Sequence, residues 1–411
     1  MQKAIRKQLV KIAFNPFVFF KYNLLITYGI GFVISMFLFK DEYFYYSLKT
    51  MAIISFSFFL FWLGWRSIEK VKIKKLTYQS SKLSTYLFAL IFILTSSYIF
   101  YYTPPAILGS LLGSDLTSSE LRAMATKGKT GIDSIINGFF YASSYIGVGA
   151  FVLLFFYEKR HFKWLVLFIA IFVLLLNGQK SRFIIVILPL LMFFIQNREF
   201  KYIKILVSIA GVSLFLVMLS LSFLDIGTNT GHTVLIETQE RLTQGGRDLF
   251  ENQSPLKFII HRLVWIPYIT AVDWLRYIDT ELTEYLMGGS IPLLSNVLGV
   301  DRINLDNAVF KFQYNVSSSS LGAANSFFAF DLIANFGYVG LLMLSPLFGM
   351  VFNIIWKGLP SPFNLMVFVW LYSFQASSFQ ALFLGGGMFI ILFAILAKNI
   401  TSSTTQYKKR Q

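Results

Sequence analysis

Runs of apolar residues alternate with short polar segments along most of this chain, and one long polar segment interrupts the pattern. A helix needs about 20 apolar residues to cross the hydrocarbon core of a membrane. By this criterion we predict about ten transmembrane helices. Their expected ranges are 22–39, 45–65, 83–102, 135–157, 163–177, 182–196, 202–224, 327–352, 363–381 and 384–398. The predicted fold class is an all-α polytopic integral membrane protein.

The long polar segment, 225–326, divides the single predicted membrane domain into three parts. Residues 1–224 hold the first seven predicted helices, and 327–411 hold the last three and a cytoplasmic tail. The segment between them contains 11 of the 20 Asp and Glu residues but 7 of the 36 Lys and Arg. We interpret it as an extracytoplasmic catalytic loop with interfacial helices. Its apolar part is expected to lie at the membrane interface, anchored by Trp265, Tyr268, Trp274 and Tyr277.

Composition and charge support this class and exclude others. With 56% hydrophobic residues, 14% charged residues and a mean hydropathy of +0.63, the chain is too apolar for a soluble domain of its length. The net charge of +16 does not indicate nucleic-acid binding, because the bases cluster beside the predicted helices. The alternate segments that include both termini hold 22 Lys and Arg against three acids, which predicts that both termini are cytoplasmic.

Two cations in the predicted outward turn 177–182 stand where positive charge is normally avoided. Lys180 precedes the sixth predicted helix, and Arg182 opens it. A guanidinium at this depth suits an anionic lipid headgroup such as a pyrophosphate. The alternative is that Arg182 extends toward the interface and satisfies a helix end.

The long loop carries more arginine than lysine, which favours bidentate binding of phosphate or carboxylate. Arg247 follows two glycines that allow a ligand to approach closely, and Arg262 lies in apolar surroundings that require a partner. Arg241 completes this group. The alternative is a solvated loop with internal ion pairs, for example between Arg276 and Asp273.

A general base could come from several side chains of the same loop. His232, His261, Glu237, Asp248 and Asp273 are all predicted to face outward. Each of them alone is more often structural, and the sequence does not choose among them. The chain has no P-loop, dinucleotide fingerprint, nucleophile elbow or histidine-rich motif, and it has no cysteine. No metal or cofactor is predicted.

The eighth predicted helix begins with a polar pair. Asp331 and Asn335 are spaced i, i+4, so we expect them to share one helix face near the outer end. A carboxylate at this depth should face a cavity or a partner, such as one of the arginines. The alternative is a helix-packing contact in which Gly337 and Gly340 allow close approach.

Three short motifs together resemble the bacterial O-antigen and capsule repeat-unit polymerases (Wzy-type) and, more distantly, the O-antigen ligases. The first motif is the outward turn NGQKSR, whose arginine opens a helix. The second is the loop pair GGRDLF and HRLVWIP. The third, NSFFAFDLIANFGYVG, places Asn325 before aromatic residues and a Gly-x-x-Gly step. Ligases often have a histidine before this asparagine, and Ala324 stands there instead, which favours a polymerase.

The resemblance implies a glycosyltransferase in the bacterial inner membrane. It would join oligosaccharide repeats carried on undecaprenyl pyrophosphate, at the outer face, for lipopolysaccharide or a related polysaccharide. A chain-length regulator and the flippase of the same pathway would be its partners, besides membrane lipids. The implied catalytic residues are Arg262, His261, Arg247 and Glu237. The implied pyrophosphate- and sugar-binding residues are Arg182, Lys180, Arg241, Arg276, Trp265, Asn325 and Asp331.

Two alternatives remain open. An O-antigen ligase would use the same donor with a lipid A-core acceptor. A flippase or transporter for the lipid-linked sugars would more typically show internal repeats and polar sites at the bilayer midplane. Here the polar residues gather in one loop outside the predicted helices.

Overall fold

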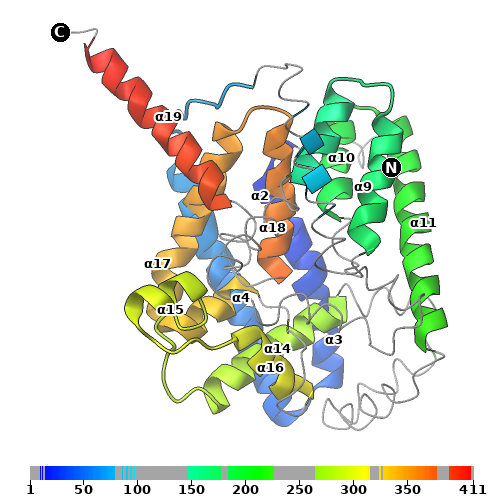
Figure 1. Cartoon of the computed structure of the whole chain (residues 1–411). Helices are drawn as coiled ribbons and strands as arrows, with labels where there is room; N and C mark the ends of the chain where they lie inside the picture. The colour runs from blue at the N-terminus through cyan, green and yellow to red at the C-terminus, as the bar shows by residue number, and fades with distance from the viewer. Residues whose placement is uncertain are drawn as a thin grey trace.

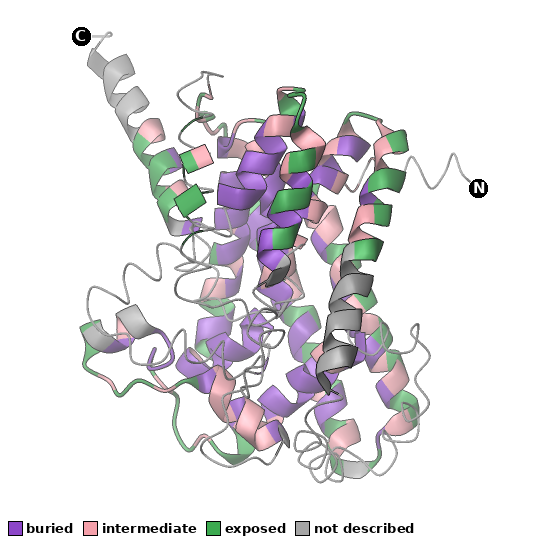
Figure 2. Cartoon of the chain, turned by 45° about the vertical axis from the view of Figure 1, so that its right-hand side comes forward, coloured by how far each residue is buried: buried purple, intermediate pink, exposed green. Residues whose placement is uncertain are grey.

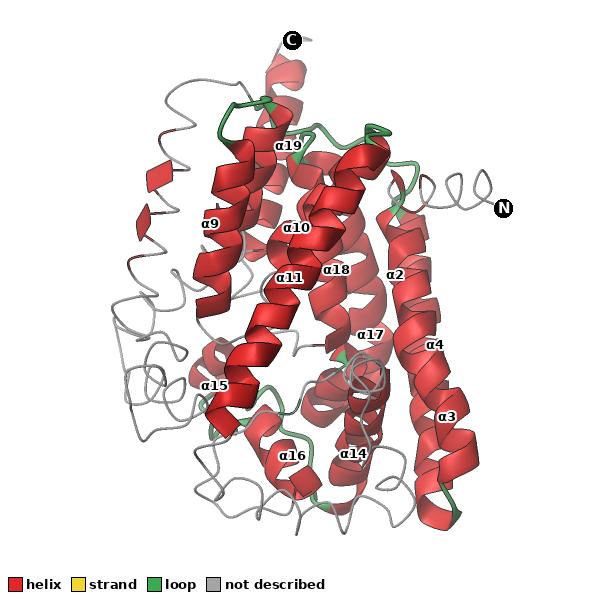
Figure 3. Ribbon diagram, turned by 90° about the vertical axis from the view of Figure 1, so that its right-hand side faces the viewer, coloured by secondary structure: helices red, strands yellow, loops and turns green. Residues whose placement is uncertain are grey.

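A computed structural model describes residues 14–78, 147–176, 184–225, 264–314, 327–376 and 388–408, and the single residues 10, 12, 86, 89, 90, 93, 94, 97 and 324. These residues form helices joined by turns and extended segments, and none of them lies in a strand. Figures 1 and 3 show a bundle of helices with α14 lying across one end of it. The all-helical prediction is therefore confirmed for the described part of the chain.

The N-terminal half of the described chain contributes two long helices and two hairpins. Its elements are α2 (Pro16–Leu24), the π-helical turn η1 (Leu25–Gly29), α3 (Ile30–Leu38), α4 (Asp41–Ser67), the helix Gly147–Tyr157, α9 (Lys163–Leu176), α10 (Ile184–Gln196) and α11 (Phe200–Asp225). The C-terminal half contributes α14 (Ile266–Thr280), α15 (Pro292–Leu298), α16 (Leu305–Tyr314), α17 (Phe328–Gly358), η3 (Phe363–Leu365), α18 (Met366–Ala376) and α19 (Met388–Lys408).

Three helices of the described chain are long and apolar enough to cross a membrane. They are Pro16–Leu38, Glu42–Ser67 and Phe328–Gly358, which overlap three of the predicted ranges. Shorter apolar helices occupy Gly147–Tyr157, Lys163–Leu174, Ile184–Gln196, Phe363–Gln375 and Ile390–Asn399. The chain thus has the character of a helical membrane protein, while the full set of ten spans stays a prediction.

The first long helix begins six residues before the predicted boundary at residue 22 because its start is capped. The Asn15 side chain accepts hydrogen bonds from the backbone N–H groups of Phe17 (3.0 Å) and Val18 (3.3 Å). Pro16 occupies the first turn, where its missing N–H removes no helical hydrogen bond. Farther along, the Tyr28 hydroxyl donates to the backbone carbonyl of Gln375 and ties this helix to α18.

Helices α4 and α17 form the central contact of the bundle, and two glycines make it close. A Cβ atom on Gly64 would overlap the backbone carbonyl of Pro346, and one on Gly349 would overlap that of Phe61. The absence of side chains therefore lets the two backbones touch, as at the small-residue interfaces of membrane helices. Buried residues concentrate along these central helices (Figure 2).

Helix α17 is kinked at Gly337, whose φ of 66° and ψ of −166° are not helical. The same glycine leaves room for the ring of Tyr285, which would lie 2.8 Å from a Cβ atom added at this position. At Gly340, an added Cβ would instead meet Phe336 of the same helix. The expectation that these glycines allow two helices to approach is therefore wrong, because Gly337 serves the kink and the contact with a loop tyrosine, and Gly340 lies against its own helix.

The described charges divide between the two ends of the bundle. The end bearing the turns after α4, after the helix Gly147–Tyr157 and after α10 is basic. Its bases include Arg66, Lys70, Lys72, Lys74, Lys75, Lys159, Arg160, Lys163, Arg198, Lys201, Lys204, Lys357 and Lys398, and its acids include Glu69, Glu158 and Glu199. The end bearing α14 to α16 includes Glu42, Asp273, Asp279, Glu281, Glu284, Asp301 and Asp306 with Lys49, Arg276, Arg302 and Lys311. This separation agrees with the charge pattern from which the orientation is predicted.

A candidate functional site around helix α14

Helix α14 comes from the predicted outward loop but is fixed between the first two long helices. The Tyr268 hydroxyl lies 2.6 Å from the Ser47 hydroxyl, which in turn lies 2.6 Å from that of Ser35. Gly31 leaves the space that the Tyr268 side chain occupies. This chain of hydroxyl groups joins α14 to α3 and α4, so the side chains on α14 have fixed positions relative to the bundle.

Arg276 is one of the two arginines of this loop, with Arg302, that lie in the described part of the chain. Its guanidinium lies over the ring of Tyr43, 4.1 Å from the centroid, with the ring of Phe312 at 5.6 Å. One guanidinium nitrogen donates to the Tyr43 hydroxyl. The side chain is 19% exposed, and its Nε atom is buried with no hydrogen-bond partner among the described residues. Aromatic contacts on the guanidinium hold it in place with little freedom to rotate.

Two carboxylates balance the charge of Arg276. Asp273 Oδ1 lies 3.5 Å from the guanidinium, and Glu42 Oε1 lies 3.9 Å from it. The ion pair with Asp273 is the internal pair that the sequence offered as the alternative to a ligand site. One helical turn further along α14, Asp279 pairs with Lys49 of α4. In this cluster the three acids Glu42, Asp273 and Asp279 therefore outnumber the two bases, Arg276 and Lys49.

Asp273 is the buried carboxylate of the cluster, with 1% of its surface exposed. Burial raises the pKa of this carboxyl from 3.8 to about 7, although Arg276 and a hydrogen bond from Gln313 favour the charged form. Gln313 also donates to the Thr270 hydroxyl at 3.3 Å. Within the described residues, Asp273 Oδ2 has no hydrogen-bond partner. The carboxyl can therefore change its protonation near neutral pH.

A second buried polar group lies where the loop meets α17. Asn335 donates to Asp331 Oδ1 at 3.0 Å and to the Ser290 hydroxyl at 2.8 Å. Ser290 lies 3.3 Å from Asp331 Oδ1, and all three side chains are at most 3% exposed. The expected shared face of Asp331 and Asn335 is confirmed. Their contacts fix the segment before α15 onto α17, which is the packing alternative rather than an open cavity.

Trp265 is part of the core and does not contact solvent or lipid as a sugar-binding or anchoring side chain would. It is 6% exposed and packs on Phe39 at 5.5 Å between ring centroids. Tyr268 and Trp274 are also buried, at 0% each. The prediction that aromatics anchor an interfacial segment is therefore wrong for these three, which the bundle covers, whereas the fourth, Tyr277, is half-buried.

The other predicted site residues lie outside the described part of the chain. They are Lys180, Arg182, Glu237, Arg241, Arg247, His261, Arg262 and Asn325. The structure brings together Arg276 and Asp273 from the predicted loop and adds Glu42, Tyr43 and Gln313. Sequence reasoning missed these three, because Glu42 and Tyr43 are more than 230 positions from Arg276 and no local pattern connects them.

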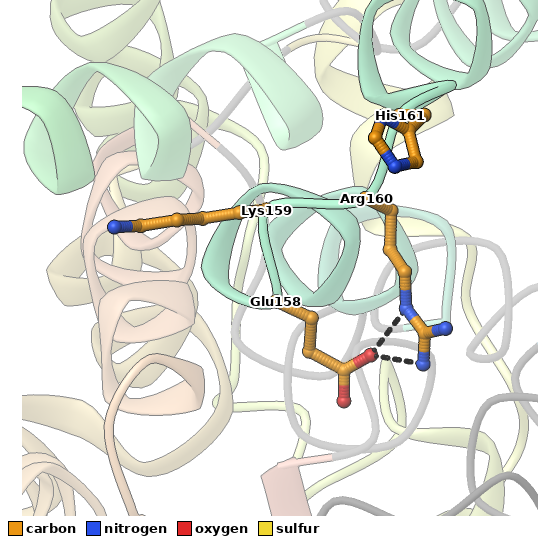
Figure 4. Close-up of a pocket in the computed structure, with 4 residues that line it drawn as sticks. All are labelled: Glu158, Lys159, Arg160 and His161. Atoms are coloured by element: carbon orange, nitrogen blue, oxygen red, sulfur yellow. Dashed lines mark hydrogen bonds and ion pairs between the residues drawn. The ribbon is translucent and has the colours of Figure 1, made fainter.

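A separate hollow of about 480 Å³ lies at the basic end, lined by Glu158, Lys159, Arg160 and His161 (Figure 4). Arg160 donates to Glu158 Oε2 at 2.8 Å, and the Tyr78 hydroxyl donates to the other carboxylate oxygen at 3.0 Å. Lys159 extends away from this pair. The hollow is thus distinct in place and charge from the cluster around Arg276.

No family model, curated protein or solved structure matches this chain. Among the described residues, no three His, Cys, Asp or Glu side chains lie together in a way that would hold a metal ion. The fold and the charge pattern define the broad class, a helical membrane protein with an acidic, aromatic-lined cluster at one end.

Proposed function

We propose that this protein is a glycosyltransferase that polymerises undecaprenyl-pyrophosphate-linked oligosaccharide repeat units at the outer face of the inner membrane. The observation that carries the proposal is the fixed group of Arg276, Glu42 and Tyr43 on and against α14. An arginine edge, a carboxylate and an aromatic ring are the groups that bind sugar hydroxyls and ring faces. Arg276 belongs to the loop 225–326 that the charge pattern predicts to face outward, and Glu42 and Tyr43 lie against it in the first turn of α4.

The reaction would transfer the growing chain to a hydroxyl of the incoming unit. The hydroxyl oxygen forms a bond with the anomeric carbon, and the bond from that carbon to the pyrophosphate oxygen breaks. Undecaprenyl pyrophosphate leaves with the electron pair, and the hydroxyl proton passes to a base. A positively charged group beside the pyrophosphate lowers the barrier by stabilising the charge that develops on it.

The described residues refine the roles within this proposal. Arg276 already faces two carboxylates, so we assign it to the saccharide and leave the pyrophosphate to Arg182, Arg247 and Arg262. Asp273 is too buried to touch a substrate, and we assign it the positioning of Arg276. The base stays with His261 or Glu237, as the resemblance implies.

A strain that lacks the gene tests the function directly. It is complemented with the wild-type protein or with Arg262→Ala at matched membrane levels, and its surface glycans are resolved by gel. A deletion that leaves single repeats supports a polymerase, whereas loss of even the one-repeat product indicates a flippase or a ligase. An unchanged ladder in the deletion strain would refute the proposal.

The variant Arg276→Lys tests the saccharide site in the same strain. Lysine keeps the charge but loses the planar fork that reaches Tyr43, Asp273 and Glu42 together. We expect a ladder that is short or absent with Arg276→Lys. The control, Arg302→Lys, changes a neighbouring loop arginine outside the cluster and should leave the ladder intact. Equal ladders for both variants would remove Arg276 from the site.

A further inference from the structure

Two helical hairpins at the basic end of the bundle have similar turns. Two residues after the end of the helix Gly147–Tyr157 and of α10, a basic residue adopts the left-handed conformation, Lys159 with φ 53° and Arg198 with φ 59°. The backbone N–H of the next residue bonds back to Phe155 in the first turn (3.0 Å) and to Phe194 in the second (2.8 Å). This geometry ends each helix abruptly and presents its cations at the same end of the bundle.

Aromatic contacts join the two turns into one surface. Trp164 at the start of α9 packs on Phe194 at 6.3 Å and on Tyr202 at 5.7 Å. Lys163 Nζ lies 5.6 Å from the centroid of the Tyr202 ring, and Lys201 Nζ lies 4.9 Å from the same centroid. Two ammonium groups thus converge on one tyrosine ring.

No acid of the described chain forms an ion pair with Lys163 or Lys201. Glu158 is engaged by Arg160 and by the Tyr78 hydroxyl, so its charge is compensated locally (Figure 4). Glu199 directly precedes α11, at the helix N-terminus that favours an acid. The surface between the two turns therefore keeps a surplus of positive charge.

An exposed apolar surface begins directly beside these cations. On α9, Leu165, Phe168 and Phe172 are 55%, 62% and 54% exposed. On the neighbouring α11, Ile205 and Val207 are 45% and 60% exposed. Phe172 lies nine residues after Lys163, which on a helix is about 14 Å. Positive charge followed by an apolar strip of this length matches the shape of a phospholipid, with a charged headgroup and apolar tails.

We propose that Lys163, Lys201 and Tyr202 bind the phosphate headgroup of an anionic phospholipid, whose acyl chains lie along the exposed faces of α9 and α11. The two ammonium groups neutralise the phosphodiester, and the ring of Tyr202 holds both of them beside each other. This site is independent of the saccharide cluster at the opposite end, and it does not depend on the glycosyltransferase proposal.

Native mass spectrometry of the purified full chain tests the site, with phosphatidylglycerol as the probe and phosphatidylcholine as the neutral comparison. Each lysine near an anionic surface contributes about a fivefold factor in affinity. We therefore expect Lys163→Gln/Lys201→Gln to weaken phosphatidylglycerol binding about 25-fold and to leave phosphatidylcholine binding unchanged. The control, Lys70→Gln/Lys72→Gln, removes the same charge from another part of the same end and should bind as the wild type does.

Two further measurements separate the site from its alternatives. The variant Lys163→Arg/Lys201→Arg keeps both charges and should retain phosphatidylglycerol, which distinguishes lost binding from lost folding. Inorganic phosphate at millimolar concentration should not displace the lipid, because it lacks acyl chains. Equal weakening in the Lys70 and Lys72 control, or displacement by inorganic phosphate alone, would overturn the proposal.

Discussion

Asp273 gives a sharp test of the cluster around Arg276, because its burial makes stability depend on pH. Below about pH 4 the carboxyl is protonated in both the folded and the unfolded chain, and it contributes no penalty. Between pH 3.8 and about pH 7, the carboxyl has lost its proton in the unfolded chain but keeps it in the folded chain. The free energy of unfolding therefore falls as the pH rises through this range. Above about pH 7 the folded chain must hold the ionised carboxylate, and the loss of stability is at its full value.

The size of the effect follows from the pKa. Each pKa unit corresponds to about 1.4 kcal/mol, so holding Asp273 ionised in the folded state costs about 4 kcal/mol. The variant Asp273→Asn has nearly the same shape and no charge to bury. It should be more stable than the wild type by about 4 kcal/mol at pH 8 and by only about 2 kcal/mol at pH 5. Its thermal stability should vary less with pH over this interval.

Melting curves of the purified protein, followed by tryptophan fluorescence from pH 5 to pH 8, measure this. The matched control is Asp279→Asn, another substitution on α14. It removes a partly exposed carboxylate that pairs with Lys49 of α4. An exposed ion pair contributes at most about 1 kcal/mol, so this control should keep the wild-type pH dependence. If Asp273→Asn keeps that dependence as well, or melts lower at pH 8, the assigned effect of burial is refuted.

Two further substitutions test how the bundle and α14 are held. Gly349→Ala should lower the free energy of unfolding by about 3 kcal/mol or more, because the added Cβ would overlap the backbone of α4. The control Gly211→Ala has no atom near its Cβ position and should not destabilise the protein. Tyr268→Phe should cost about 1 to 2 kcal/mol by removing its hydrogen bonds to Ser47. Chemical denaturation in detergent measures both, and an unchanged midpoint in either variant contradicts the corresponding contact.

The positions of several helices could be predicted from the sequence because the length of an apolar run is a local property. The predicted helix at 163–177 corresponds to α9 at Lys163–Leu176, and the predicted start at 327 is one residue from the start of α17. The early start at Pro16 was missed, since Asn15 and the proline cap a helix whose first residues are less regular in hydropathy. Hydropathy locates the apolar part of a helix better than it locates a capped end.

Tertiary contacts could not be read in the same way. The aromatic composition of α14 is equally compatible with an interface anchor and a buried helix, and only the neighbouring α3 and α4 decide that Tyr268 and Trp274 are covered. Glycine spacing indicated Gly337 and Gly340 for helix contact, whereas the close approach occurs at Gly64 and Gly349. Which glycines meet another backbone depends on how two distant helices cross, and no local spacing encodes that crossing.

The charges around Arg276 decide what kind of group this arginine can bind. Two carboxylates already lie within 4.0 Å of its guanidinium. At an effective dielectric constant of about 20, each negative charge brought to about 4 Å from the exposed Glu42 meets a repulsion of about 4 kcal/mol, and Asp273 adds to this repulsion when it is ionised above about pH 7. A pyrophosphate would meet this repulsion more than once and would gain from a single, already compensated cation. Neutral sugar hydroxyls meet no such repulsion, and they can accept from the partly exposed Arg276 side chain and donate to Glu42, which is 63% exposed. Arg276 is therefore better suited to the saccharide than to its pyrophosphate carrier.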